Sequence, residues 1–335
     1  MSSRNPSSPP QLAGFTYQRL LGTGGFADVF LFRQDMPNRE VAVKVLLQNI
    51  SNDEVKQMFR FEMDAMGRLG GHPSILTVHQ AGISSDGRPF MVMEYCPEGL
   101  GRAWRDRPLP LADVLHIGVK IGSALETAHR ASVVHRDIKP SNILWTAYGK
   151  PVLADFGISN RLARGNESSV VAMSVPWSAP EVIRGDVLDT KQAEVRAEVY
   201  SLGATLYSLL AGRSPFEVAD SGQNSRDNLK SRILKGLYTS IGRADVPDVV
   251  EKVLNKSMFK DAPNRYASML EFVSELQDVQ RALGLPVSDL ELPTNLHAQY
   301  EPVVAPAPAS ANQPATLGGG VYVEVETKRR RAQRS

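Results

Sequence analysis

Short apolar runs separated by turn residues dominate the chain from residue 15 to about residue 95, and they predict a β-rich segment. The predicted strands are 17–21, 29–32, 41–45, 75–81 and 90–94. One helix interrupts them over 52–69, where Phe59, Met63 and Met66 recur at helical spacing. A small β-rich unit with a single helix is therefore expected at this end of the chain.

Helical periodicity replaces the strand pattern after residue 96. Between residues 111 and 130, for example, Val114, Ile117 and Ile121 fall on one face of a helix. The further predicted helices are 193–211, 225–236, 246–258 and 268–283. The chain is thus expected to be an α+β protein of two lobes, a β-rich lobe over 15–95 and a larger helical lobe over 96–283.

Both ends of the chain have the composition of disordered segments. Residues 1–14 are polar and rich in Ser and Pro, and we expect them to be disordered. A Pro/Ala/Gly-rich linker and a basic tail are expected over 284–335, with a short strand as an option at 321–325. The basic end is expected to be solvated, and docking to an acidic partner or an anionic membrane surface is the alternative.

Composition narrows the class of protein without identifying it. The sequence of 335 residues is 42% hydrophobic and 22% charged, as in soluble globular proteins. A net charge of +2 gives no sign of a nucleic-acid or membrane surface, and the single cysteine, Cys96, suits a reducing compartment. No apolar run approaches the ~20 residues that span a bilayer, and no signal peptide is visible. We therefore expect a cytoplasmic protein without a transmembrane segment.

A glycine-rich turn lies between the first two predicted strands. It consists of Leu21, Gly22, Thr23, Gly24, Gly25, Phe26, Ala27, Asp28 and Val29. Small residues let backbone N–H groups approach phosphate oxygens, although such a turn alone is weak evidence. No helix follows at once, which excludes a dinucleotide-binding fingerprint and a P-loop. The next predicted strand ends in Lys44, and a lysine that closes an apolar strand needs a negative partner.

The predicted helix at 52–69 offers that partner. Glu62 lies among apolar neighbours on this helix, and Asp64 is the nearest competitor. A carboxylate here is expected to pair with Lys44 and hold it toward bound phosphates.

The chemistry is concentrated in two stretches, 135–142 and 155–157. Asp137 can orient a hydroxyl group, and Lys139 can neutralise a phosphate. Asn142 and Asp155 are hard oxygen donors of the kind that hold Mg²⁺. An acid, a lysine and two metal ligands are the parts that phosphoryl transfer requires.

Five ordered motifs resemble the signature of the protein kinases. They are the glycine-rich turn, Val41-Ala42-Val43-Lys44, His135-Arg136-Asp137-Ile138-Lys139-Pro140-Ser141-Asn142, Asp155-Phe156-Gly157 and Ala179-Pro180-Glu181. The resemblance covers about residues 15–283 and is strongest to the bacterial eukaryotic-like (Hanks-type) serine/threonine kinases, in particular the actinobacterial type. It implies the two-lobed kinase fold, with a small antiparallel sheet and one key helix in the N-terminal lobe.

The resemblance also implies a role for each motif residue. Asp137 matches the residue that accepts the substrate hydroxyl proton, and Lys139 the lysine that contacts the γ-phosphate in serine/threonine-specific members. The resemblance favours Glu62 over Asp64 as the carboxylate that pairs with Lys44 and holds it toward the phosphates, while Asn142 and Asp155 match the Mg²⁺ ligands. The residues expected around adenine are Ala42, the guarding Met93, and Glu94, Tyr95 and Cys96 of the hinge.

The resemblance also implies which residues take part in regulation and which stabilise the fold. Arg136 resembles the arginine that pairs with a phosphate on the activation loop. The candidate serines there are Ser159, Ser168, Ser169 and Ser178, and autophosphorylation is predicted at Ser168 or Ser169. Ser174 falls in the substrate-facing loop, and Glu181 is expected to pair with Arg265.

Three positions depart from the family pattern. Ala27 replaces the usual third glycine, Met173 stands where a glycine is usual, and Glu198 replaces the aspartate that braces the catalytic loop. An extra methylene at Glu198 must be accommodated in a tight site.

The leading hypothesis is an ATP-dependent serine/threonine protein kinase that uses Mg²⁺, with Mn²⁺ as the alternative ion, and that phosphorylates itself and other proteins in signalling. A pseudokinase or scaffold is the alternative that Glu198 and Met173 favour. A small-molecule phosphotransferase is the third, and the Ala179-Pro180-Glu181 segment argues against it.

Overall fold

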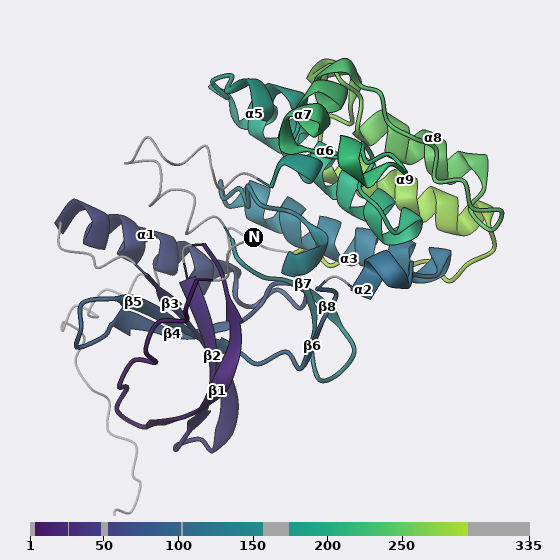
Figure 1. Cartoon of the computed structure of the whole chain (residues 1–335). Helices are drawn as coiled ribbons and strands as arrows, with labels where there is room; N and C mark the ends of the chain where they lie inside the picture. Colours follow the sequence, from purple (N-terminus) through teal and green to yellow (C-terminus); the bar gives the residue numbers. More distant parts are fainter. Residues whose placement is uncertain (1–3, 26, 48–52, 102, 157–173, 294–335) are drawn as a thin grey trace, which may run out of the picture. The chain divides into compact units, whose positions relative to one another are not determined.

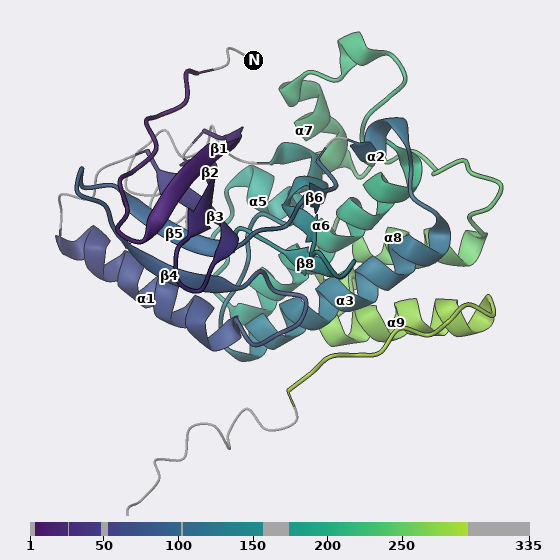
Figure 2. The same cartoon turned by 90° about the horizontal axis from the view of Figure 1, so that it is seen from below.

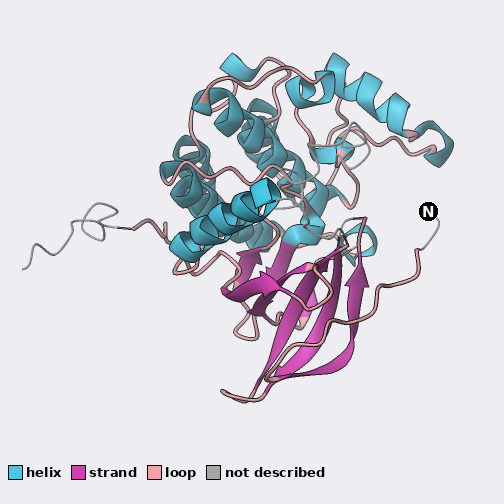
Figure 3. Ribbon diagram, turned by 90° about the vertical axis from the view of Figure 1, so that its left-hand side faces the viewer, coloured by secondary structure: helices cyan, strands magenta, loops and turns pink. Residues whose placement is uncertain are grey.

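A computed structural model describes residues 4–25, 27–47, 53–101, 103–156 and 174–293. In the helix at 53–69 the side chains of 53–56, 58, 61 and 62 lie outside this description. The described residues belong to one compact unit that ends at Pro293. Strands gather at one end of this unit and helices at the other (Figure 3).

The larger sheet is antiparallel and has five strands in the order β1-β2-β3-β5-β4. Their bounds are β1 Phe15–Thr23, β2 Ala27–Gln34, β3 Arg39–Leu46, β4 Val78–Ile83 and β5 Pro89–Glu94. Alternation along β2 and β3 sends Phe30 and Val43 into one apolar cluster and Val29 and Ala42 into another. The sheet is therefore apolar on both faces, and only the face with Val29 and Ala42 bears the predicted site.

Helices make up most of the remaining described chain (Figure 1). They are α1 Asp53–Leu69, α2 Ala103–Asp106, α3 Leu111–Arg130, α5 Pro180–Arg184, α6 Lys191–Ala211, α7 Arg226–Lys235, α8 Asp248–Ser257 and α9 Met269–Ala282. A second sheet consists of three short strands, β6 Glu98–Gly99, β7 Ile143–Trp145 and β8 Pro151–Leu153. Helices α2 and α3 lie between β6 and β7 in the sequence, and the catalytic stretches precede β7 and follow β8.

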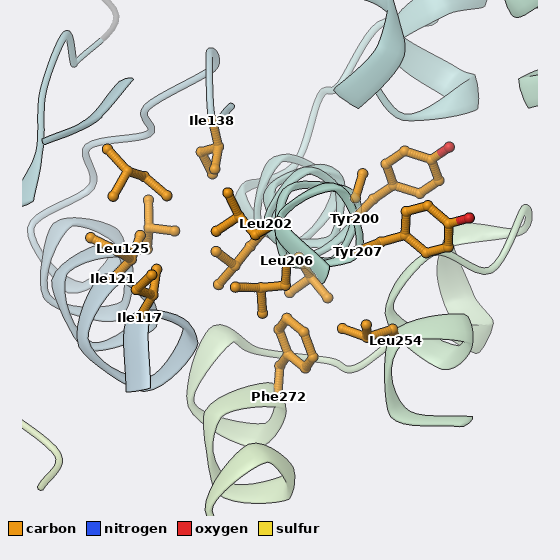
Figure 4. Close-up of a cluster of buried hydrophobic side chains, with 14 of the residues drawn as sticks. Ile117, Ile121, Leu125, Ile138, Tyr200, Leu202, Leu206, Tyr207, Leu254 and Phe272 are labelled. Atoms are coloured by element: carbon orange, nitrogen blue, oxygen red, sulfur yellow. The ribbon is translucent and has the colours of Figure 1, made fainter. Parts of the chain in front are cut away.

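Helix α6 passes through the centre of the helical core. It is buried around most of its circumference, and Leu202 and Leu206 meet Ile121 of α3 and Phe272 of α9 in one cluster (Figure 4). Helices α3 and α9 run side by side (Figure 2). They approach so closely that a Cβ atom at Gly122 would lie 2.2 Å from Val273 Cγ2. The catalytic residues are therefore supported by a tightly packed core.

The predicted α+β architecture with a β-rich and a helical part is confirmed. The long helices begin and end within two residues of their predicted bounds. The fourth strand begins at Val78 rather than at residue 75, because Ile75 instead forms a parallel bridge with Leu153 of β8.

The two ends of the unit differ from the expectation of disorder. Residues 4–10 form no helix or strand, yet Arg4 and Ser7 bond to Asp28 of β2. Beyond α9, Glu291 forms an ion pair of 2.7 Å with Lys120 of α3. Both segments find specific polar partners on the folded unit, which composition alone does not reveal. The segment 321–325 and the basic tail lie outside the described residues.

No helix within the described residues is both long and apolar enough to cross a bilayer.

Candidate active site

Because side chains alternate along β3, Lys44 lies on the face of the sheet that bears the predicted site. It shares a face with Ala42, and it lies opposite Val29 of β2 and Met91 of β5 in the register. Its side chain is buried, so its ammonium group needs an anion nearby. The partner is Asp155, whose Oδ1 lies 2.6 Å from Lys44 Nζ. Lys44 thus has a negative partner in Asp155, which the sequence analysis did not name as its partner.

Asp155 follows β8 directly and adopts a left-handed backbone conformation with φ of 64°. This conformation is uncommon for a residue other than glycine and occurs often at functional sites. Desolvation raises the pKa of the Asp155 carboxyl, but the charge and hydrogen bond of Lys44 lower it further, and the net shift is downward. The carboxylate is therefore ionised, and with 41% of the side chain exposed it stays accessible to a cation.

The predicted catalytic residues of the stretch 135–142 converge on one carboxylate. Lys139 Nζ lies 2.6 Å from Asp137 Oδ2. Asn142 Nδ2 donates to the Asp137 carbonyl oxygen at 2.8 Å and to Oδ2 at 3.2 Å. Ser174 Oγ donates to Asp137 Oδ1 at 2.7 Å and accepts from Lys139 Nζ at 3.0 Å. Asp137 is consequently fixed by groups on both of its oxygens.

His135 connects the stretch 135–142 to the stretch that begins at Asp155. It is fully buried, donates from Nε2 to the Ala154 carbonyl oxygen at 2.8 Å and accepts at Nδ1 from the Asp137 N–H at 3.2 Å. Its ring lies 4.6 Å from that of Phe156, measured between centroids. The Ala154 N–H in turn donates to the Asn142 carbonyl oxygen at 2.8 Å. These bonds place the backbone at Asp155 beside that of Asn142.

Glu198 braces the catalytic loop despite its extra methylene group. This buried side chain of α6 accepts from the Arg136 backbone N–H at 2.6 Å through Oε1. Its Oε2 lies 2.6 Å from Nε2 of His129, which is also buried. Burial raises the pKa of Glu198, while the bond and charge of His129 lower it, with a net shift downward. The additional length is thus taken up by a second partner on α3.

Arg136 itself adopts a positive φ of 65°, and its guanidinium group donates to Glu194 Oε1 at 2.5 Å. The arginine that the resemblance assigned to an activation-loop phosphate therefore rests on an acidic side chain of α6.

The expected pairing of Glu181 with Arg265 is present. Arg265 Nη1 and Nη2 donate to the two carboxylate oxygens of Glu181 at 2.7 and 2.8 Å, and both side chains are buried. The pair joins α5 to the segment before α9, as expected of a structural ion pair.

The apolar residues of the predicted nucleotide site gather in one cluster beneath the sheet. Leu21, Val29, Ala42, Met93 and Cys96 all belong to it. Burial is the main factor that raises the pKa of the Cys96 thiol to about 12, so this residue is neutral and weakly polar. The same cluster contains Leu144 and Ala154, which the sequence reasoning did not include. Leu144 lies two residues after Asn142, and Ala154 lies directly before Asp155. This closeness in sequence to the predicted metal ligands could have identified both residues.

The glycine-rich turn is only partly described. Gly24 N–H donates to the Ala27 carbonyl oxygen at 2.8 Å, and Thr23, Gly24 and Gly25 are exposed. Asp28 departs from the expectation of a nucleotide contact, because its side chain bonds to Arg4 and Ser7 on the face opposite Val29. Because side chains alternate along β2, Val29 faces the predicted nucleotide site and Asp28 faces the N-terminal segment.

Several predicted residues lie outside the description. The backbone of Glu62 is part of α1, but its side chain is not described, and the predicted pair with Lys44 stays a prediction. Phe26, Met173 and the candidate phosphorylation sites Ser168 and Ser169 also lie outside the described residues.

The donor set suits a hard divalent cation. Asn142 donates to Asp137 through its amide nitrogen, so its amide oxygen is the atom left to bind a metal ion. Together with the ionised Asp155 carboxylate this gives two oxygen ligands, and Mg²⁺ takes its other ligands from water and nucleotide phosphates. No group of three or more His, Cys, Asp or Glu side chains among the described residues forms a metal site of protein ligands alone.

Comparison with known proteins gives a consistent result. The family model described as the protein kinase domain matches residues 15–278. The serine/threonine-protein kinase PknK of Mycobacterium bovis is 40% identical over 299 residues, which cover 87% of this chain and 26% of that protein. The serine/threonine-protein kinase PrkC of Bacillus subtilis is 33% identical over 270 residues, covering 77% of this chain and 39% of that protein. The chain thus spans well under half the length of these relatives.

Proposed function

The chain belongs to the protein kinase family, among the bacterial eukaryotic-like serine/threonine kinases, and from this premise we propose that it transfers the γ-phosphoryl group of ATP to serine or threonine hydroxyls of proteins. The observation that carries the proposal is the cluster around Asp137, in which Lys139, Asn142 and a serine hydroxyl meet one carboxylate. An active kinase requires such a carboxylate, whereas a scaffold does not.

Asp137 orients the incoming hydroxyl group and accepts its proton as the oxygen attacks. Ser174 shows that a hydroxyl oxygen fits within hydrogen-bond distance of Asp137 Oδ1 and Lys139 Nζ at the same time. Lys139 is placed to neutralise charge on the γ-phosphoryl group during transfer. These two residues supply position and charge, which account for most of the catalysis in phosphoryl transfer.

Lys44 binds the α- and β-phosphates of the nucleotide in this proposal. Its salt bridge to Asp155 keeps the ammonium group on the face of β3 that bears Ala42, and Glu62 is the proposed second carboxylate partner. Asn142 and Asp155 would hold Mg²⁺, or Mn²⁺ in its place, and the bound ion would supply positive charge against the phosphates.

Adenine is proposed to bind against the apolar cluster of Leu21, Val29, Ala42, Met93 and Leu144, between the sheet and β7. The backbone of Glu94, Tyr95 and Cys96 is proposed to form its hydrogen bonds. Backbone N–H groups of Gly22, Thr23, Gly24 and Gly25, with Phe26 and Ala27, are proposed to cover the phosphates.

Protein substrates, autophosphorylation and a cytoplasmic location complete the proposal. The substrate-facing position of Ser174 beside Asp137 supports a protein substrate over a small molecule. Autophosphorylation is proposed at Ser168 or Ser169. An acidic or membrane-surface partner of the basic tail is proposed on the charge of its Lys328–Arg331 run.

The pseudokinase alternative loses one of its two supports. Glu198 was a reason to doubt the catalytic loop, but its carboxylate makes the backbone contact to Arg136 that the loop requires.

The test is phosphate incorporation from radiolabelled ATP into a generic basic protein substrate, with Mg²⁺ and then with Mn²⁺. Wild type is compared with Lys44→Met and Asp137→Asn, and circular dichroism checks that both variants are folded. Transfer by wild type that both variants lose supports the proposal. Absence of transfer by the wild type with either ion makes the scaffold function the better account.

A further inference from the structure

A buried carboxylate lies on the outer face of the larger sheet, opposite the proposed nucleotide site. Asp28 of β2 has no exposed surface, and it shares its face with Phe30, while Val29 points to the other side. A buried charge on a sheet needs strong partners, since desolvation alone would cost several kcal/mol.

Within the described residues, the hydrogen-bond partners of the Asp28 carboxylate come from the N-terminal segment. Arg4 binds both carboxylate oxygens, with Nη1 3.2 Å from Oδ2 and Nη2 in contact with Oδ1. Ser7 donates its backbone N–H to Oδ2 at 2.7 Å and its hydroxyl to the same atom at 2.6 Å. Burial raises the pKa of Asp28, but the bonds from Arg4 and Ser7 lower it, and the net shift is downward. Asp28 is therefore an ionised anchor for a segment outside the sheet.

The same arginine reaches the glycine-rich turn. Arg4 Nη2 donates to the Gly24 carbonyl oxygen at 3.1 Å, and Gly24 N–H donates to the Ala27 carbonyl oxygen at 2.8 Å. We use the name N-terminal clasp for Arg4, Ser7, Asp28 and Gly24. The clasp ties the turn to β2 from the outer face of the sheet.

The rest of the segment is held independently of the clasp. Arg88 Nη2 donates to the Ser8 carbonyl oxygen at 2.9 Å, and Leu12 and Phe15 pack against the outer apolar cluster of the sheet. The segment runs as a loop beside the strands of this sheet (Figure 3). Opening the clasp would thus free residues 4–7 without detaching the segment from the protein.

We propose that Ser7 is a phosphorylation site and that a phosphate on it opens the N-terminal clasp. In the reaction Ser7 Oγ bonds to the γ-phosphorus of ATP, the bond to the β,γ-bridging oxygen breaks, ADP leaves and the hydroxyl proton passes to the base of the acting kinase. The proposal holds for whichever serine kinase supplies the phosphate.

The chemistry of the clasp makes it sensitive to this change. The bond from Ser7 Oγ to Asp28 needs the hydroxyl hydrogen, which a phosphate ester lacks. A phosphoserine also brings a charge of about −1.5 to −2 against a carboxylate, and the single positive charge of Arg4 does not offset both. The Asp28 side chain is completely covered, so a phosphate group has no room beside it.

Ser7 and not Ser8 is the sensitive position. Ser7 is half-buried and points its hydroxyl at Asp28, whereas the Ser8 side chain is exposed and Arg88 bonds to the Ser8 backbone carbonyl. The two adjacent serines therefore provide a matched pair. A phosphate adds the same charge at either position, but only at Ser7 is it expected to open the clasp.

Opening the clasp is expected to loosen the glycine-rich turn, because Gly24 loses its bond to Arg4. Weaker nucleotide binding follows, and this step rests on the proposed function, in which the turn covers the ATP phosphates. The effect on the turn itself does not depend on that function.

The experiment installs phosphoserine at position 7 or at position 8 in the full chain during translation. Amide hydrogen exchange of residues 22–28 and the Kd for ATP with Mg²⁺ are then measured against the unmodified chain. Phosphate at Ser7 is expected to speed exchange at Gly24, Ala27 and Asp28 by at least about tenfold, since charged hydrogen bonds are lost. It is also expected to raise the Kd severalfold, and phosphate at Ser8 is expected to change neither quantity.

Arg4→Met provides a second way to open the clasp and should reproduce the exchange pattern of phosphate at Ser7. Equal exchange for the chains phosphorylated at Ser7 and Ser8 would overturn the proposal. Faster exchange only with phosphate at Ser7, combined with no ATP binding by any form, would support the clasp and count against the proposed kinase function.

Discussion

The hydroxyl group of Ser174 donates a hydrogen bond of 2.7 Å to Asp137 Oδ1 and accepts one of 3.0 Å from Lys139 Nζ. A serine of the chain therefore bonds the two residues that would act on a substrate hydroxyl. It lies directly before the turn Val175–Trp177, which leads into α5. Ser174 thus links the catalytic loop to the segment that the family uses to face its substrate.

Ser174→Ala should lower turnover by roughly tenfold to a hundredfold, because Asp137 and Lys139 each lose a charge-assisted hydrogen bond. Ser174→Thr keeps the hydroxyl group and should retain most of the activity. Steady-state phosphorylation of a basic protein substrate measures both variants. Equal loss in the two would show that the side-chain volume matters at this position and the hydroxyl does not.

Glu198→Gln should weaken both the fold and catalysis. The substitution removes the charge that accepts from the Arg136 N–H and that pairs with His129, while both sites stay buried. Losing hydrogen bonds to a charged acceptor at a buried site typically costs about 1.5–3 kcal/mol. Urea unfolding gives the stability change, and turnover at saturating ATP gives the catalytic one. Unaltered turnover in a folded Glu198→Gln variant would remove Glu198 from the support of the catalytic loop.

The buried pair of Glu181 and Arg265 should contribute to stability more than to chemistry. Arg265→Met is expected to lower the free energy of unfolding by about 3–5 kcal/mol, since Glu181 is left as an unpaired buried charge. Glu181→Leu combined with Arg265→Met removes both charges and should cost less than the sum of the single changes. A thermal-unfolding double-mutant cycle measures this coupling, and strict additivity would contradict it.

His72 gives the fold a pH dependence. It donates from Nε2 to the Glu291 carbonyl oxygen at 2.8 Å and accepts at Nδ1 from the Ser74 N–H, so its neutral form is the bonded one. Burial lowers its pKa below the ordinary 6.5, against the opposite effect of Glu291 and with a small contribution from the Lys120 charge. Below pH 6.5 the unfolded chain therefore binds more protons at this residue than the folded chain.

The stability that neutral His72 contributes is complete above pH 6.5 and is lost as the pH falls toward the lowered value. The free energy of unfolding should consequently fall more steeply between about pH 7 and about pH 5 in wild type than in His72→Asn, which keeps an acceptor for the Ser74 N–H. Urea titrations across this range measure both slopes. Parallel slopes would show that His72 does not titrate differently in the folded state.

Much of the catalytic arrangement follows from sequence, because its residues lie in short motifs whose spacing fixes their neighbours. Asp137, Lys139 and Asn142 fall within six residues, and a loop of that length necessarily brings them together. The helices were predictable for a similar reason, since the apolar stripe of α3 repeats over twenty residues.

Contacts between distant segments could not be predicted in this way. The bond of Glu198 to His129 depends on how α6 and α3 pack, and the sequence alone left the fit of an extra methylene open. Asp28 was assigned to the nucleotide with the rest of its motif, whereas strand alternation turns it toward Arg4 and Ser7. Composition likewise favoured disorder before residue 15, because a clasp made by two side chains leaves no periodic signal.

The most direct test of the central claim is the rate of phosphate transfer from ATP by the wild type and by Asp137→Asn, measured at saturating ATP and substrate. The variant keeps the shape of the residue and loses the base. It is expected to slow transfer by about a hundredfold to ten-thousandfold while ATP still binds. Equal rates for the two proteins would contradict the role given to Asp137, and with it the account of this site as the centre of a protein kinase.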